Sequence, residues 1–187
     1  CLQPLYTLIM LSSALLLSAC TSSAASIDDW VAEGSFTDGI EGPAVGPDGK
    51  LYVPNLERQG TIGVITGKDQ AEIFIELPEG SIGNSIRFNQ DGQMFIADYA
   101  GHNIFKVDLH SGEIIETYHD DRMHQPNDIA FTNSGVIYAT DPDWSTESGQ
   151  LWRLDLSNGR FTLLEADMGT TNGIELSPDG TRLYVNE

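Results

Sequence analysis

Short apolar runs recur along the chain after residue 27, and each is bounded by a turn rich in glycine, aspartate, asparagine or serine. Four segments align without gaps, and each ends in a glycine: residues 41–49, 84–92, 127–135 and 172–180. A polar residue opens each segment eight positions before its glycine, and these openers are spaced 43, 43 and 45 residues apart. Such a fixed period indicates a tandem structural repeat.

Each complete repeat predicts four short β-strands. The first lies within the aligned segment, and the second follows its glycine (residues 51–53, 94–96, 136–138 and 183–185). The third (62–65, 104–107 and 151–154) is joined to the fourth (71–75, 113–118 and 160–164) by a glycine-containing turn. Asp-Gly, Asn-Gly and Ser-Gly pairs between short apolar runs favour hairpins. No segment keeps the 3.6-residue period of an amphipathic helix.

Four antiparallel strands per repeat are typical of a β-propeller blade, so we predict an all-β propeller. Residues 28–187 hold three complete repeats and the first two strands of a fourth, or about three and a half blades. A six-bladed ring of this period needs about 260 residues, so we expect an incomplete propeller domain. Trp30–Phe36 is predicted to form one further strand that could complete the last blade.

The first 27 residues differ from the rest because they carry no charge. Residues 5–19 are mostly apolar or small, and about 15 such residues are too few to span a bilayer but suit a signal peptide. Leu17-Ser18-Ala19-Cys20 resembles a bacterial lipobox. We therefore predict a signal peptide over 1–20, lipidation at Cys20, a polar tether over 21–27, and an exported lipoprotein that faces the periplasm. The alternative is an ordinary signal peptide with an incidental cysteine.

Charge narrows the choice of partners. The chain has 28 acidic and 9 basic residues, for a formal net charge of −19. Nucleic acids and anionic lipids need a basic face, so we expect no nucleic-acid partner and membrane contact only through the lipid anchor. A cationic partner such as a metal ion is favoured. The sequence shows no glycine-rich phosphate loop, zinc-type Cys/His spacing or serine nucleophile elbow.

The four opening residues of the repeats are candidate ligands: Glu41, Asn84, Asn127 and Asn172. The first strand of each propeller blade lines the central channel, so equivalent positions form a ring around it. One carboxylate and three carboxamides offer oxygen ligands that suit a hard cation such as Ca²⁺. Asparagine is also an ordinary turn residue, but four openers in phase favour a functional ring.

A second set of polar residues ends the second strands. Asn55, Asp98 and Asp141 each stand six residues after the repeat glycine, and Glu187 stands seven after it. Because the second strand returns to the face where the first began, these residues are expected near the same channel mouth. Their alternative role is to cap the turn into the third strand.

Three further residues near the third opener are candidates. Asp128 follows Asn127 and is expected to support a ligand by hydrogen bonding. His124 stands three residues before Asn127. It could act as a general base, or it could be a solvated loop histidine. Trp144 could line a substrate pocket or pack beneath its loop.

The sequence resembles the senescence marker protein/gluconolactonase/luciferin-regenerating-enzyme-like family. The matching motifs are Glu41-Gly42-Pro43, Gln125-Pro126-Asn127-Asp128 with residues 138–142, and Asn172-Gly173-Ile174 with residues 177–180 and 183–185. Paraoxonases, a related propeller group, carry a run similar to the last of these. The resemblance covers most of residues 30–187.

The resemblance implies a six-bladed propeller that hydrolyses lactones with one divalent cation, usually Ca²⁺. By motif, Glu41 and Asn172 would be direct metal ligands, and Asn127 would contact the metal or the substrate. The family's remaining ligand, also proposed as general base, is an aspartate in the following blade, which lies beyond residue 187. Some relatives carry a sugar-contacting arginine where this chain has Gln125, and this difference affects the expected substrate.

We therefore expect a Ca²⁺-dependent lactone hydrolase in which the cation polarises the lactone carbonyl and a carboxylate activates water. Substrate contacts or supporting roles are expected for Asn84, Gln125, Asp128 and Asp141. The stretch of chain by itself is expected to be inactive. The alternative is a non-catalytic exported propeller that binds a carbohydrate, peptide or envelope component around a structural Ca²⁺, because a fold alone does not fix function.

Overall fold

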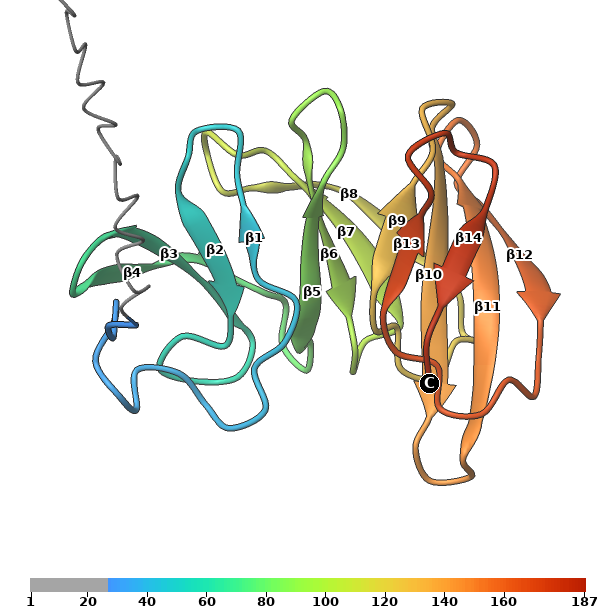
Figure 1. The fold of residues 1–187 in the computed structure, drawn as a ribbon, viewed down its shortest axis with the longest axis horizontal. Helices are drawn as coiled ribbons and strands as arrows, with labels where there is room; N and C mark the ends of the chain where they lie inside the picture. The colour runs from blue at the N-terminus through green and yellow to red at the C-terminus, as the bar shows by residue number, and fades with distance from the viewer. Residues whose placement is uncertain (1–26) are drawn as a thin grey trace, which may run out of the picture.

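The computed structural model describes residues 27–187, and the regular structure in this range consists of strands (Figure 1). The predicted signal peptide, Cys20 and nearly all of the predicted tether lie outside the described residues. Across residues 27–187, no helix has the length and hydropathy that crossing a membrane requires.

Each predicted repeat forms one antiparallel sheet whose strands are hydrogen-bonded in chain order. The first sheet comprises β1 (Ala44–Val45), β2 (Leu51–Pro54), β3 (Thr61–Gly67) and β4 (Gln70–Glu76). The second comprises β5 (Gly83–Phe88), β6 (Met94–Asp98), β7 (Asn103–Val107) and β8 (Ile114–His119). The third comprises β9 (Ile129–Phe131), β10 (Val136–Asp143), β11 (Ser148–Asp155) and β12 (Arg160–Glu165), and β13 (Ile174–Leu176) pairs with β14 (Leu183–Val185). The prediction of four strands per complete repeat is confirmed.

The repeat glycines make the turns between first and second strands possible. Gly49, Gly92, Gly135 and Gly180 all have φ between 68° and 79°. A side chain in this left-handed region is strained, and glycine enters it freely. The periodic glycine in the sequence therefore marks a backbone requirement of each blade.

The first strands of successive sheets are neighbours. Strand β5 contacts β1 and β9, and β9 contacts β13. In Figure 1 these first strands run in the same direction, and they start on the lower side of the molecule, where the β6–β7 and β10–β11 turns also lie. The openers and the ends of the second strands therefore share one face, which we call the opener face.

The core lies between the sheets. One apolar cluster, including Ile62, Ile96 and Phe105, fills the space between the first and second sheets. Another, including Phe95 and Ile104, fills the space between the second and third. Adjacent residues of a strand point to opposite faces, so β6 and β7 each contribute to both clusters, and the second sheet is buried on both sides.

The predicted strand Trp30–Phe36 is wrong. These residues form bends and turns, and their only pairing is a single bridge between Phe36 and Leu56. Gly34 has a φ of 79°, which interrupts extended backbone, and Trp30 is 56% exposed. The backbone oxygen of Trp30 accepts a hydrogen bond of 2.9 Å from the amide of Asp69, so this segment lies beside the β3–β4 turn.

Replacing Ile96 by alanine is expected to lower the free energy of unfolding by about 2–5 kcal/mol, because a cavity opens between two sheets. Ile115 is 51% exposed, and I115A serves as the matched control, expected within about 0.5 kcal/mol of the parent. Urea unfolding measures both values. Equal losses would contradict the placement of the core between the sheets.

Candidate functional site

The side chain of Asn84 joins the openers of three repeats. The β5–β6 ladder pairs Gly83 with Asp98 and Ser85 with Ala97, so Asn84 occupies a bulge without a cross-strand partner. A bulge re-aims a side chain. The Nδ2 atom of Asn84 donates to Oε2 of Glu41 at 3.5 Å and to the backbone oxygen of Asn127 at 3.1 Å.

The third and fourth openers are tied together by Thr140, which is fully buried in β10. The amide of Asn127 donates to the backbone oxygen of Thr140 at 2.9 Å, and the Thr140 hydroxyl donates to the backbone oxygen of Asn172. Asn127 is only 2% exposed. Within residues 27–187, the side-chain amides of Asn127 and Asn172 form no hydrogen bond, so no contact in this range occupies their oxygens.

Glu41 is held at this ring by the glycine that follows it. Gly42 has a φ of 48°, and a Cβ atom built there would lie 2.4 Å from the Cα of Ser85. Its backbone oxygen accepts a hydrogen bond of 2.8 Å from the amide of Ile86. This close approach sets the exposed carboxylate of Glu41 next to Asn84.

The second polar set holds the turns of the opener face together. Asp98 is fully buried, and its Oδ1 accepts the amides of Ile82 at 2.9 Å and Gly101 at 3.0 Å. Asn55 donates from Nδ2 to the backbone oxygen of Gly83 at 3.3 Å. The Asn55–Gly83 contact joins the first blade to the second. Asn55 and Asp98 each also accept a hydrogen bond from a glycine of the turn into the third strand, which agrees with the capping interpretation of these two residues.

Asp141 shapes the loop that carries Asn127. Its buried carboxylate accepts the amides of His124 at 2.8 Å and Gln125 at 2.6 Å, and the indole Nε1 of Trp152 at 2.9 Å. Burial raises the pKa of Asp141, while these three donors act in the opposite direction. Because the carboxylate is enclosed, it serves the conformation of the loop.

Gln125 connects two turns at the rim of the opener face. Its Nε2 donates to the hydroxyl of Tyr99 at 2.7 Å, and its Oε1 accepts the amide of Trp144 at 3.3 Å. Trp144 is 43% exposed, so its indole offers apolar surface beside these polar groups. The ring Nδ1 of His124 lies 3.4 Å from Oδ2 of Asp143, and its predicted role as a general base stays a prediction.

The described residues supply few carboxylates for a cation. Residues 27–187 contain no group of three or more His, Cys, Asp or Glu side chains placed to hold a metal ion. Among the openers, Glu41 is the one carboxylate, and the other oxygen donors are amides. This oxygen-only set fits a hard cation and does not suit one that prefers sulfur.

Sequence reasoning missed three residues that organise the site: Gly42, Thr140 and Arg87. Gly42 and Thr140 lie within the motifs that the chain shares with the gluconolactonase-like family, so those motifs could have indicated them. Arg87 forms an ion pair of 2.6 Å with Asp128. No repeat signal marks it, because the equivalent positions hold Ala44, Ala130 and Glu175.

A family model described as the SMP-30/Gluconolactonase/LRE-like region matches residues 40–187. The chain belongs to this family. A gluconolactonase from Zymomonas mobilis is 32% identical over 117 residues, which cover 55% of this chain and 33% of that protein. The chain thus spans about a third of the length of the curated relative that it matches. The relation to paraoxonases stays a prediction.

Solved structures confirm the propeller fold of this SMP-30/gluconolactonase-like chain. A gluconolactonase from Xanthomonas campestris matches with a TM-score of 0.64 and 19% identity, over 79% of this chain and 54% of that one. Regucalcin from Agrobacterium tumefaciens, a calcium-binding protein, matches with a TM-score of 0.60 and 23% identity, over 79% and 50%. A virginiamycin B lyase from Staphylococcus aureus matches with a TM-score of 0.65 and 18% identity, over 83% of this chain and 50% of that one.

The close approach at Gly42 in this SMP-30/gluconolactonase-like chain is testable. G42A is expected to cost about 1–3 kcal/mol more unfolding free energy than G49A, because its Cβ collides with the Ser85 backbone. Gly49 also has a positive φ, but nothing lies within 4 Å of its Cβ position, so G49A reports the backbone strain alone. Urea unfolding of both variants decides, and equal losses would contradict the close packing.

Proposed function

We propose that the protein hydrolyses a lactone with the help of a divalent cation, Ca²⁺ in the first instance, bound at the opener face. The observation that carries the proposal is the Asn84 side chain, which bridges the carboxylate of Glu41 and the backbone of Asn127. Residues from three blades thereby converge at one place. The family membership and the gluconolactonase relative support the choice of reaction.

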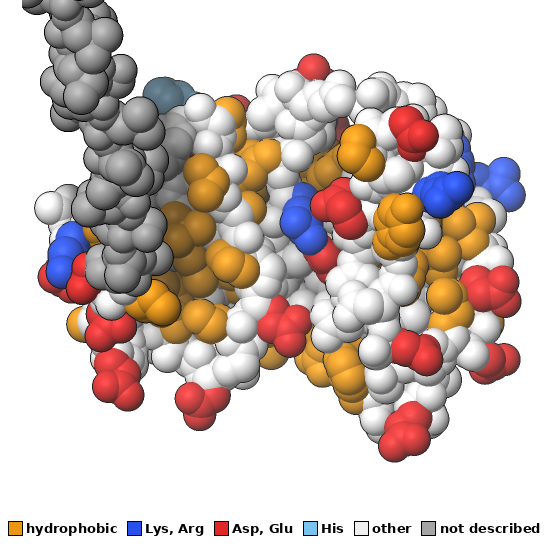
Figure 2. Space-filling model, in the orientation of Figure 1, with side chains coloured by type: hydrophobic (Ala, Val, Ile, Leu, Met, Phe, Trp, Pro, Cys, Tyr) orange, Lys and Arg blue, Asp and Glu red, His pale blue; other side chains and the backbone are white. Residues whose placement is uncertain are grey.

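Glu41, Asn127 and Asn172 would hold the cation. Asn84 donates to Glu41, so it would orient that carboxylate and not act as a ligand. The excess of acidic residues, visible as scattered red side chains in Figure 2, would draw cations to the protein. A complete site would take a further carboxylate from a following blade.

A cation bound there would polarise the lactone carbonyl and stabilise the oxyanion of the tetrahedral intermediate. The residues of the chain contribute binding and orientation. The amide of Gln125 and the hydroxyl of Tyr99 offer hydrogen bonds to a hydroxylated lactone, and the indole of Trp144 offers an apolar contact. The neutral Gln125 favours an uncharged substrate over an anionic one.

The general base is proposed to be an aspartate of the following blade, with His124 as the weaker candidate. A carboxylate beside a bound cation stays ionised and can take a proton from water. The exported, lipid-anchored location through Cys20 is also a proposal, which rests on the lipobox-like sequence alone. Neither a nucleic acid nor a further membrane contact is proposed as a partner.

Removal of the cation tests the reaction. Hydrolysis of glucono-δ-lactone by the full-length protein should be lost after EDTA treatment and should return on addition of Ca²⁺. Activity that persists in EDTA would contradict a role for the cation. Calcium binding without hydrolysis of any lactone tested would instead favour the non-catalytic binding propeller.

E41Q tests the carboxylate at the opener face. This variant is expected to lose on the order of 100-fold or more in kcat/KM, because Lewis-acid assistance is worth several kcal/mol. E113Q is the matched control, since Glu113 is an exposed carboxylate between β7 and β8 and is outside the proposed site. Equal activity of the two variants would exclude Glu41 as a ligand.

A further inference from the structure

The carboxylate of Asp128 accepts four hydrogen bonds from three first strands. Its Oδ1 accepts Nε of Arg87 on β5 at 3.0 Å and the amide of Ile129 on β9 at 2.9 Å. Its Oδ2 accepts Nη2 of Arg87 at 2.6 Å and the amide of Ile174 on β13 at 3.2 Å. The ion pair is two-pronged, which fixes the direction as well as the distance between the groups.

The pair spans the strands that carry the asparagine openers. Arg87 lies three residues after Asn84, and Asp128 lies one residue after Asn127. Ile174 lies two residues after Asn172. A displacement of the Asp128 carboxylate would therefore move all three openers relative to one another.

The repeat does not require this arrangement. At the junction of the first two sheets, the amide of Ile86 donates to the backbone oxygen of Gly42. At the junction of the third sheet with the β13–β14 pair, Ile174 is equivalent to Ile86 and Asp128 is equivalent to Gly42. There the amide of Ile174 donates to the side chain of Asp128. The residues equivalent to Asp128 in the other repeats are Gly42, Ser85 and Gly173, so this carboxylate is a departure from the repeat.

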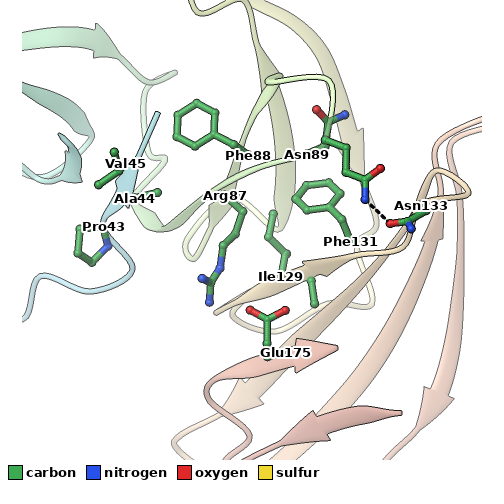
Figure 3. Close-up of a pocket in the computed structure, with 12 residues that line it drawn as sticks. Pro43, Ala44, Val45, Arg87, Phe88, Asn89, Ile129, Phe131, Asn133 and Glu175 are labelled. Carbon is green, nitrogen blue, oxygen red and sulfur yellow. Dashed lines mark hydrogen bonds between the residues drawn. The ribbon is translucent and has the colours of Figure 1, made fainter. Parts of the chain in front are cut away.

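The charge of Arg87 offsets the cost of burying the Asp128 carboxylate. Asp128 is 8% exposed, and a buried carboxylate without a cationic partner is costly. The hydrogen bonds with Asp128 in turn raise the pKa of Arg87, which stays charged. Arg87 lines a cavity of about 480 Å³. Figure 3 shows its side chain and that of Glu175 in this cavity.

We propose that Arg87 is a positioning residue for the cation site: through Asp128 it sets the spacing of Asn84, Asn127 and Asn172. This inference rests on the proposed function and names a residue that neither the motifs nor the repeat indicate. In this role Arg87 acts through Asp128 and is not itself a ligand of the cation. Partners that orient ligands typically change metal affinity by 10- to 100-fold when they are lost.

Calorimetric titration of the full-length protein with Ca²⁺ tests the proposal. R87M is expected to weaken Ca²⁺ binding by about 10-fold or more. R153M is the matched control, because Arg153 is similarly exposed and pairs with Asp155 on β11, away from the first strands. The control should bind Ca²⁺ as the parent does. Near-UV circular dichroism at the titration temperature verifies that both variants are folded.

Two further variants separate position from charge. R87K keeps the charge and loses the two-pronged geometry, so it should remain weakened; full recovery would show that charge alone matters and would overturn the proposal. D128N should weaken binding as R87M does, and the double variant R87M/D128N should be no weaker than either single one, because both changes break one unit. Additive losses would show that the two residues act separately.

Hydrogen exchange gives a readout that does not depend on the cation. In R87M the amide of Ile174 should exchange faster, and that of Ile86, which donates to Gly42, should exchange as in the parent. A parent protein that binds no Ca²⁺ would overturn the proposed function together with this role. Normal Ca²⁺ binding by R87M would overturn the role of Arg87 alone.

Discussion

The structure depends on the requirement that both faces of each inner sheet be covered. Alternation along β6 and β7 sends Phe95 and Ile104 to one face and Ile96 and Phe105 to the other. A single sheet cannot bury both faces, so its neighbours must pack on either side. Stacked in this way, the sheets bring their first strands together, and the opener face is where those strands begin.

The site therefore belongs to no single blade. Glu41 precedes β1, Asn84 lies in β5, and Asn127 and Asn172 precede β9 and β13. Each position depends on a contact with the next blade: Gly42 packs on Ser85, Asn84 bridges two openers, and Thr140 joins the last two. A site assembled from such contacts is only as rigid as the packing between the sheets.

Four acidic side chains at or near the openers divide into two groups. Asp98, Asp128 and Asp141 are buried, and backbone amides, an indole or a guanidinium occupy their oxygens. They hold loops and strands in place. Glu41 is exposed, and among the openers it is the one carboxylate, which we propose as a ligand of the cation. The large negative charge of the chain is thus less informative about the site than the partners of each carboxylate.

The sequence by itself determined the period, the strands of each complete repeat and the phase of the openers, because turn glycines and apolar alternation act over a few residues. The phase of the repeat also predicted that Glu41, Asn84, Asn127 and Asn172 lie on one face, because equivalent positions of successive blades face the same way. Tertiary structure alone decided the bulge that aims Asn84, the Arg87–Asp128 pair and the irregular path of Trp30–Phe36. Each of these depends on a partner in another blade or strand, and no spacing along the chain encodes such a partner.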